Sequence, residues 1–315
     1  MAGMMNSFYY GKAGKADFTP EQMPSNRRQL FFDTLRVRFS GLIGLNLLYI
    51  LIMLPSLIWM VLNYSVLTAS IQGELDVLEG VATAAAGPLS TADLGGIVFM
   101  FCLGMIPCMM IAGAFKPGII YVIRNWSRDQ HSFVFSDFKD AVKTNWKQGL
   151  LVGFINGASL LFTYQSYVYY GTMAAIGSVA WVIPQMFVVI VCAVWWMVNM
   201  VIFPMMITYK MKFSHLVRNC FIIILARLPW SLLIWGVSVA IPFLLIFTGY
   251  IPYGMLVGVV LYLIVGFSLT FHVYTSYANS CFDRFLNPRI EGASVNMGLR
   301  DPADDIDDDE DEVQK

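Results

Sequence analysis

Ionisable side chains are scarce inside the long apolar stretches of this sequence, and His272 is the one that lies deepest in such a stretch. It shares a helical spacing with Ser268 and Asn279. A histidine in this position could change its charge near neutral pH or bind a metal ion. The other histidines, His131 and His215, lie in polar segments and offer no second ligand nearby. We therefore expect a hydrogen-bonded His272 and no metal site.

Two further polar stripes follow helical spacing in other apolar stretches. If the three stripes faced one another, they could line a cavity for an ion or a small ligand. The residues that would line it are Asn156, Ser159, Thr163, Gln185, Asn199, Ser268 and His272. Polar side chains in membrane helices also join neighbouring helices by hydrogen bonds. Helix packing and cavity lining are both open alternatives at this point.

No catalytic arrangement accompanies the stripes. The predicted apolar spans contain no Asp or Glu, whereas ion-coupled carriers usually place an ionisable group near the bilayer centre. The sequence has no phosphate-binding Gly-rich loop, zinc-protease motif or serine-hydrolase motif. Its five cysteines form no CxxC pair. We expect a protein that is not an enzyme, with no catalytic residues and no cofactor.

The elements that position these groups have the composition of membrane helices. Hydrophobic residues make up 57% of the chain and charged residues 13%, against about 25% charged in soluble domains. Crossing a bilayer takes about 20 apolar residues. The sequence therefore predicts an all-α, polytopic membrane protein with six spans, at about residues 41–66, 96–115, 150–170, 182–209, 228–247 and 255–276.

The distribution of charge predicts the threading. With six spans, all 20 Lys and Arg residues fall on one side, and the outer loop 67–95 has none. Basic residues concentrate in cytoplasmic loops. We therefore expect a multi-pass membrane protein with both termini in the cytoplasm. Its parts are a flexible N-terminus (1–26), a membrane domain (27–285) with a cytoplasmic loop at 116–149, and a disordered acidic tail (286–315).

Interfacial amphipathic helices are predicted beside the spans. The stretch 27–40 mixes arginines with apolar residues, and Ser25 or Asn26 could cap it. Two later helices are predicted to begin at Phe-Ser pairs, with Ser136 and Ser214 as caps. These segments suggest a weak repeat of three units, each an interfacial helix followed by two spans.

The polar segment 116–149 is the candidate docking surface. Its basic and aromatic side chains could hold anionic lipid at the inner face of the membrane, or they could bind a partner protein. The residues are Arg124, Trp126, Arg128, Lys139, Lys143, Trp146 and Lys147. No basic surface extends over the whole chain, so we expect no nucleic acid as a partner.

The same segment carries a family resemblance. The stretch KPGIIYVIRNWSRDQHSFVFSDFKDAVKTNWKQGLLVG resembles the central part of the YesL-like bacterial membrane proteins, a domain of unknown function. The matching residues are Gly118, Tyr121, Val122, Arg124, Arg128, Asp129, His131, Phe135 and Phe138. The resemblance covers roughly residues 27–285, while the loop 67–95 and the acidic tail depart from the usual shorter pattern.

The resemblance implies a polytopic plasma-membrane protein with an accessory role in carbohydrate uptake. Relatives of this kind often lie beside genes for sugar ABC importers. A sugar ABC importer, or another membrane subunit, is the partner that the resemblance implies. It carries over no catalytic or ligand-binding residues.

Overall fold

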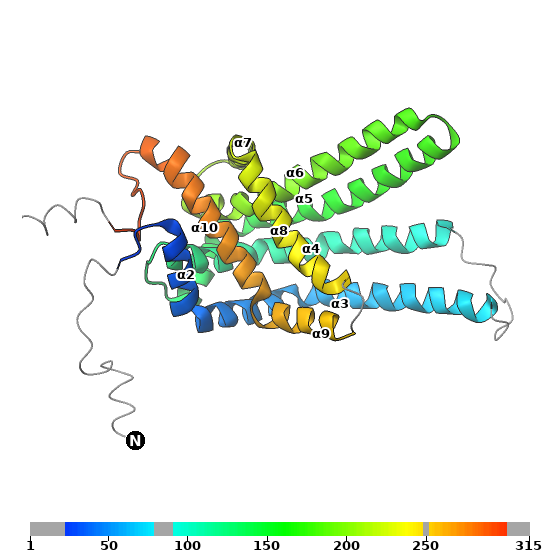
Figure 1. Ribbon diagram of the computed structural model, residues 1–315, viewed down its shortest axis with the longest axis horizontal. Coiled ribbons are helices and arrows are strands. Elements are labelled where there is room, and N and C mark those ends of the chain that lie inside the picture. Colours follow the sequence, from blue (N-terminus) through cyan, green and yellow to red (C-terminus); the bar gives the residue numbers. More distant parts are fainter. Residues whose placement is uncertain (1–22, 79–90, 248–251, 301–315) are drawn as a thin grey trace, which may run out of the picture.

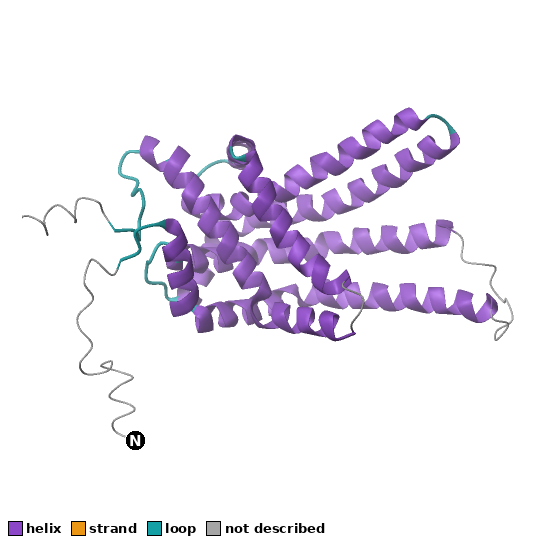
Figure 2. Ribbon diagram, viewed as in Figure 1, coloured by secondary structure: helices purple, strands orange, loops and turns teal. Residues whose placement is uncertain are grey.

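The computed structural model describes residues 23–78, 91–247 and 252–300, and this part of the chain is helical without strands (Figures 1 and 2). The all-α class is therefore confirmed for the described residues. The α-helices are α2 (Arg27–Val37), α3 (Phe39–Leu78), α4 (Thr91–Trp126), α5 (Val134–Ile176), α6 (Val182–Thr208), α7 (Phe213–Ala226), α8 (Leu228–Phe247), α9 (Pro252–Leu261) and α10 (Phe267–Phe285). Shorter turns are η2 (Val179–Trp181), the π-helix η3 (Tyr262–Gly266) and η4 (Asn287–Arg289).

The long helices α3, α4, α5 and α6 extend along the molecule, and α8 and α10 cross them obliquely (Figure 1). One end of the bundle, which we call the basal end, gathers α2, the 127–133 loop and residues 286–300. Hydrogen bonds join these segments, from Arg300 N to the Pro24 carbonyl (3.0 Å) and from the Arg128 guanidinium to the Ser294 carbonyl (3.2 Å). Both ends of the described chain therefore lie at the same end of the bundle.

Four helical stretches are long and apolar enough to cross a membrane. They are Phe39–Gln72, Leu94–Trp126, Val179–Thr208 and Leu256–Arg289. Helix α7 and the Leu228–Leu244 part of α8 meet at 97° and could count as a fifth, broken span. The remaining predicted span, 150–170, forms part of α5, which is interrupted by polar side chains and is not among these stretches. The described chain thus has a multi-pass, membrane-like architecture with four to five candidate spans.

The predicted cytoplasmic loop at 116–149 is mostly helical. Helix α4 continues through Pro117 to Trp126, α5 begins at Val134, and residues 127–133 alone connect them. The helix continues because its far end still has an apolar face to bury. Ile119 and Ile123 are completely enclosed there.

Other predicted boundaries also shift. The predicted outer loop 67–95 is helical up to Leu78 and again from Thr91, and residues 79–90 lie outside the described part. Residues 286–300 of the predicted disordered tail are ordered, because they hydrogen-bond to α2, α10 and the 127–133 loop. Residues 1–22 and 301–315, on which the remaining predictions of disorder fall, are outside the described part.

The predicted helix caps meet different outcomes. The Asn26 side chain caps α2 by accepting hydrogen bonds from the backbone N–H groups of Arg28 and Gln29. The predicted caps Ser136 and Ser214 are wrong, because both residues lie inside helices that begin earlier. At the start of α5 the Asp137 carboxylate accepts the backbone N–H of Phe133 (2.9 Å) instead.

A glycine seam holds α4 against α5. A Cβ atom placed on Gly113 would lie 2.5 Å from the Gly149 carbonyl oxygen and 2.8 Å from the Gly153 Cα. One on Gly157 would lie 2.6 Å from the Ile106 Cα. Small residues every fourth position allow helix backbones to touch in this way.

Candidate functional site

His272 lies completely buried between α10, α4 and α2. Its ring stacks on Phe31, with centroids 4.5 Å apart, and its Nε2 lies 3.2 Å from the Phe31 carbonyl oxygen. Its Nδ1 lies 3.1 Å from the Ser127 hydroxyl, which is also 2.8 Å from the Ile123 carbonyl. The Phe31 carbonyl can only accept, so Nε2 carries a proton. Both ring nitrogens of His272 thus lie within hydrogen-bond distance of a neighbour, and the contact with Phe31 joins α2 to the bundle.

The polar stripes of α5 and α6 meet each other. Asn156 donates to the Asn199 side-chain oxygen (2.9 Å) and accepts from the Trp195 indole N–H (2.8 Å). Asn199 in turn donates to the Trp195 carbonyl (3.0 Å). Further along, Gln185 donates to the Tyr167 carbonyl of α5 (3.0 Å). These residues join two helices by side-chain hydrogen bonds, as polar groups in membrane helices commonly do.

Two other predicted residues, Ser159 and Thr163, line a cavity of about 370 Å³ between α5, α6 and α7. Apolar and aromatic side chains such as Phe187 and Phe221 form most of its wall. The Ser159 hydroxyl donates to the Asn156 carbonyl in its own helix (2.7 Å). Ser159 and Thr163 of the α5 stripe thus line a cavity, whereas Gln185 and Asn199 of α6 are not among its lining residues. His272 and Ser268 of α10 have their hydrogen-bond partners in other places.

Ser268 belongs to a second buried polar site, which stabilises the π-helix η3. The Asn46 amide of α3 donates to the carbonyls of Tyr262 (2.9 Å) and Leu263 (2.8 Å), and its oxygen accepts the Ser268 N–H (3.1 Å). A π-helix lacks the regular i to i+4 hydrogen bonds and leaves backbone groups to be satisfied. The Asn46 side chain, on a neighbouring helix, provides hydrogen bonds to these backbone groups.

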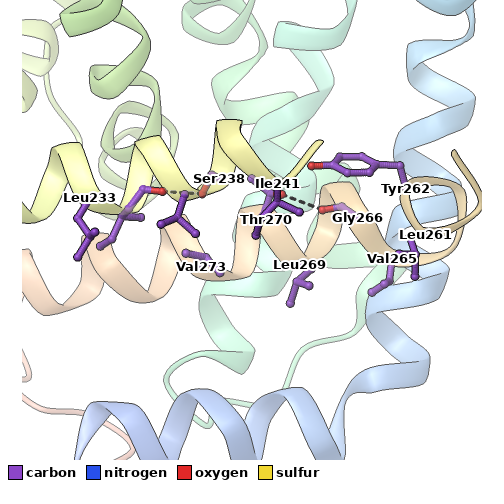
Figure 3. A pocket seen from close by; sticks show the side chains of 12 residues that line it. Leu233, Ser238, Ile241, Leu261, Tyr262, Val265, Gly266, Leu269, Thr270 and Val273 are labelled. Carbon is purple, nitrogen blue, oxygen red and sulfur yellow. Dashed lines mark hydrogen bonds between the residues drawn. The ribbon is translucent and has the colours of Figure 1, made fainter. Parts of the chain in front are cut away.

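A cavity of about 430 Å³ lies beside η3, between α8, α9 and α10 (Figure 3). Its lining is almost entirely aliphatic. The hydroxyls of Ser238 and Thr270 point along its wall, but each donates to a carbonyl of its own helix, at 2.8 and 2.9 Å (Figure 3). An apolar group therefore fits this cavity better than an ion does.

Some predicted docking residues share an exposed face at the start of α5. Lys139, Lys143, Trp146 and Lys147 are all exposed. Phe133 and Phe135 precede them and are 71% and 77% exposed. We call these six residues the α5 face. Aromatic rings and lysines together suit the boundary between lipid and water, or the surface of a partner.

The other predicted docking residues are buried and unavailable for docking. Trp126 is 5% exposed, because it packs against Gly41 with the Arg38 guanidinium 6.0 Å from its ring centroid. Arg128 is 8% exposed, because residues 286–300 cover it. Arg124 is half-buried and donates to the side chains of Asn125 (3.1 Å) and Gln130 (3.5 Å).

A polar cluster fills the basal end around these arginines. Arg27 of α2 forms an ion pair with Asp283 of α10 and donates to the Met297 carbonyl (3.3 Å). Asn287 donates to Asp283 (2.7 Å) and accepts the Tyr209 hydroxyl (2.5 Å). The cluster thereby fastens α2, the end of α6 and the chain after α10 to one carboxylate.

Glycine is required where the chain closes over Arg128. Gly298 has a φ of +82°, and a Cβ atom there would lie 2.8 Å from the Arg128 carbonyl carbon and oxygen. Only glycine combines this left-handed conformation with so close an approach. Burial lowers the pKa of Arg128, Asp283 opposes that shift, and Arg27 adds to it. Burial also raises the pKa of Tyr209 to about 12, against the opposing effect of Arg128.

Sequence reasoning missed three polar residues that the fold uses. Lys116 was expected in a loop, but it lies within α4, and its ammonium is 4.5 Å from the Phe203 ring centroid and 4.7 Å from that of Phe271. Asn46 and Asp283 were not singled out. An asparagine in the first apolar stretch was a readable signal, because polar groups in spans need partners. Nothing in the sequence pointed to the pairing of Asp283 with Arg27.

Comparison with known proteins finds one family model that matches part of the chain, and the function of that family is unknown. No curated protein and no solved structure matches this chain. A family model described as a protein of unknown function, DUF624, matches residues 42–167. The match covers nearly all of α3, all of α4 and most of α5, and so includes the glycine seam and the α5 face. This central part of the chain is therefore similar to the DUF624 family.

Proposed function

We propose that this protein is an integral membrane scaffold of bacterial cells, without enzymatic activity, that docks a partner through the α5 face. The observation that carries the proposal is the contrast within the segment 116–149. Trp126 and Arg128 of this segment are buried in contacts within the protein. In the α5 face, by contrast, two phenylalanines, a tryptophan and three lysines are exposed. Exposed aromatic residues together with cations mark an interaction surface.

The proposed location is the plasma membrane. The proposed threading has six spans, with both termini in the cytoplasm. Two observations support it. Residues 23–26 and 286–300 lie at the same end of the bundle, and the basic residues of α2, α5 and α7 belong to segments near that end. In this arrangement the lysines of the α5 face reach anionic headgroups, at about 1 kcal/mol for each basic residue near the surface.

The proposed partner is a sugar ABC importer or another membrane subunit, and the role is accessory to carbohydrate uptake. The resemblance to YesL-like proteins supports this choice, and the match to DUF624 over residues 42–167 is consistent with that resemblance but does not bear on the partner. The aromatic residues of the α5 face suit a protein surface, since aromatic side chains are enriched at interfaces.

Copurification with matched variants tests the proposal. The triple variant Lys139→Gln, Lys143→Gln, Lys147→Gln removes the charge of the α5 face, while Lys210→Gln with Lys212→Gln neutralises two exposed lysines outside it. We expect transporter subunits to copurify in mild detergent with the wild type and the control, and to be lost from the triple variant.

The uptake of labelled sugar by a deletion strain completes the test. We expect reduced uptake that the wild-type gene restores and the triple variant does not. A protein that purifies alone, in a strain whose sugar uptake does not change on deletion, would refute the accessory role. Binding of the wild type to anionic vesicles without any copurifying protein would instead identify the α5 face as a lipid contact.

A small channel or carrier is the alternative function. It requires the stripes of α5, α6 and α10 to enclose a common path. The side chains of Asn156 and Asn199 are bonded to each other, and His272 is bonded to α2 and α4. The two cavities near these helices have mostly apolar walls. We therefore favour the scaffold.

A further inference from the structure

Among the described residues, two buried polar side chains of α10 have no hydrogen-bond partner. Thr275 is completely buried with its hydroxyl unpartnered, and Asn279 is 3% exposed with both its amide nitrogen and its amide oxygen unpartnered. A buried amide without partners is costly, and such groups in folded proteins usually face water, an ion or a ligand. These two residues therefore indicate a binding partner that the described part of the chain does not supply.

Helical spacing places the unpartnered groups beside the basal arginines. His272, Asn279 and Asp283 follow one another at intervals of seven and four residues, so they share a face of α10. His272 contacts Ser127 at the end of α4, and Asp283 interacts electrostatically with Arg128, the next residue. Asn279 therefore lies between these two contacts along α10 and on the same face of the helix.

Lys116 and Arg124 of α4, together with Arg128 just after its end, bring positive charge to this part of the molecule. The Lys116 ammonium lies against the rings of Phe203 and Phe271, and Phe271 precedes Thr275 by one helical turn. The guanidiniums of Arg124 and Arg128 interact electrostatically with each other and with Tyr209, which follows Phe203 on α6. Along α10, Thr275 and Asn279 thus lie between Phe271, which contacts Lys116, and Asp283, which interacts with Arg128.

Positive charge is in excess here. Asp283 already forms an ion pair with Arg27 and accepts from Asn287. Within the described ranges, Arg124 and Arg128 donate only to neutral oxygens, and the Nε of each is buried without a partner. Two like charges held close together in a partly buried site repel each other unless an anion lies between them.

We propose that the space between Arg124, Arg128 and Asn279 binds a phosphate-type oxyanion. The guanidiniums supply charge-assisted hydrogen bonds to its oxygens, for which their planar, forked geometry is suited. The Asn279 amide and the Thr275 hydroxyl donate to further oxygens, and Lys116 adds positive charge from the interior. The oxyanion is either a soluble phosphate compound entering from the basal end or the phosphate of a lipid headgroup.

Thermal unfolding of the full chain in nanodiscs tests the site. One arm uses phosphatidylcholine nanodiscs titrated with inorganic phosphate, with chloride at matched ionic strength as the reference. The other arm compares phosphatidylcholine with nanodiscs that also contain phosphatidic acid. The variants are Arg124→Gln, Thr275→Val and Asn279→Leu, and Lys143→Gln of the exposed α5 face is the control.

The expected result is a rise in melting temperature with phosphate that is specific to the site. Loss of a charge-assisted contact in Arg124→Gln should weaken apparent phosphate affinity about tenfold or more. Thr275→Val removes an unpartnered hydroxyl, so it should not lower the melting temperature without phosphate, but it should reduce the phosphate-induced rise. Lys143→Gln should respond as the wild type does.

The two arms distinguish the source of the oxyanion. A site-dependent rise with inorganic phosphate identifies a soluble ligand, and a site-dependent rise with phosphatidic acid alone identifies a lipid headgroup. No rise in either arm, or a rise that is equal in the wild type, Thr275→Val and Asn279→Leu, would overturn the proposal. If Arg124→Gln does not fold, the comparison of Thr275→Val with the wild type still decides.

Discussion

Replacing Gly153 by alanine should force α4 and α5 apart at their closest approach. The new Cβ atom would clash with the Met109 carbonyl oxygen and lie 2.8 Å from the Met110 Cα. All of these are backbone atoms of α4, so no side chain can rotate away to make room. The helices must separate, and the polar contacts between α5 and α6 shift with them.

The magnitude follows from two opposing effects. Alanine is favoured over glycine in a helix by about 0.5–1 kcal/mol, whereas overpacking a close contact costs typically about 1–3 kcal/mol. Gly44 of α3 provides the matched control, because a Cβ atom there would meet nothing within 4 Å. Both variants gain the helical preference, so the difference between them measures the clash. We expect Gly153→Ala to be less stable than Gly44→Ala by about 2 kcal/mol.

Equilibrium unfolding in detergent micelles, with helix content as the signal, measures this difference. Gly153→Ala should unfold at a lower denaturant concentration than the wild type, and Gly44→Ala at an equal or higher one. If both variants unfold together, or if Gly153→Ala is the more stable, then the backbone contact of the glycine seam does not hold α4 against α5.

Three further predictions concern polar contacts, and each is checked by unfolding measurements. Asn46→Ala leaves the carbonyls of the π-helix unsatisfied and should cost about 1–3 kcal/mol, whereas an unchanged midpoint would contradict its bridging role. A double-mutant cycle of Asn156→Leu with Asn199→Leu should give a coupling of about 0.6 kcal/mol, and additive effects would argue against their hydrogen bond. The pKa of Tyr209 is raised from 10.0 to about 12 in the folded protein, so folding retains its proton and stability should fall as pH rises from about 10 to about 12. Tyr209→Phe should lose that part of the pH dependence, and identical profiles would contradict it.

Much of the fold was predictable because composition and periodicity are local properties. The apolar stretches, the helical class and the Asn26 cap of α2 follow from the sequence alone. Helix ends were less predictable. The segment 116–126 is polar enough to suggest a loop, yet α4 continues through it because Ile119 and Ile123 are buried by helices distant in sequence.

The candidate sites were likewise predictable only in part. Sequence reasoning identified the stripes of α5 and α6, and their contact through Asn156 and Asn199 agrees with the expectation that such residues join helices. It placed Arg128 and Trp126 at the surface, since charge and aromatic character alone favour an interface. Their burial depends on residues 286–300, on Arg38 and on Gly41, which no local pattern connects to the end of α4.

The sequence by itself determined that this is a helical, membrane-like protein and that its basic residues gather in particular segments, because hydropathy and charge depend only on which residues are neighbours in the chain. The tertiary structure decided which polar residues are partners. His272 contacts Ser127 and Phe31, Asn46 bonds to η3, and Thr275 and Asn279 are buried without a hydrogen-bond partner among the described residues. These contacts depend on the crossing angles between helices, and the crossing angles depend on the packing of helix surfaces that are far apart in sequence.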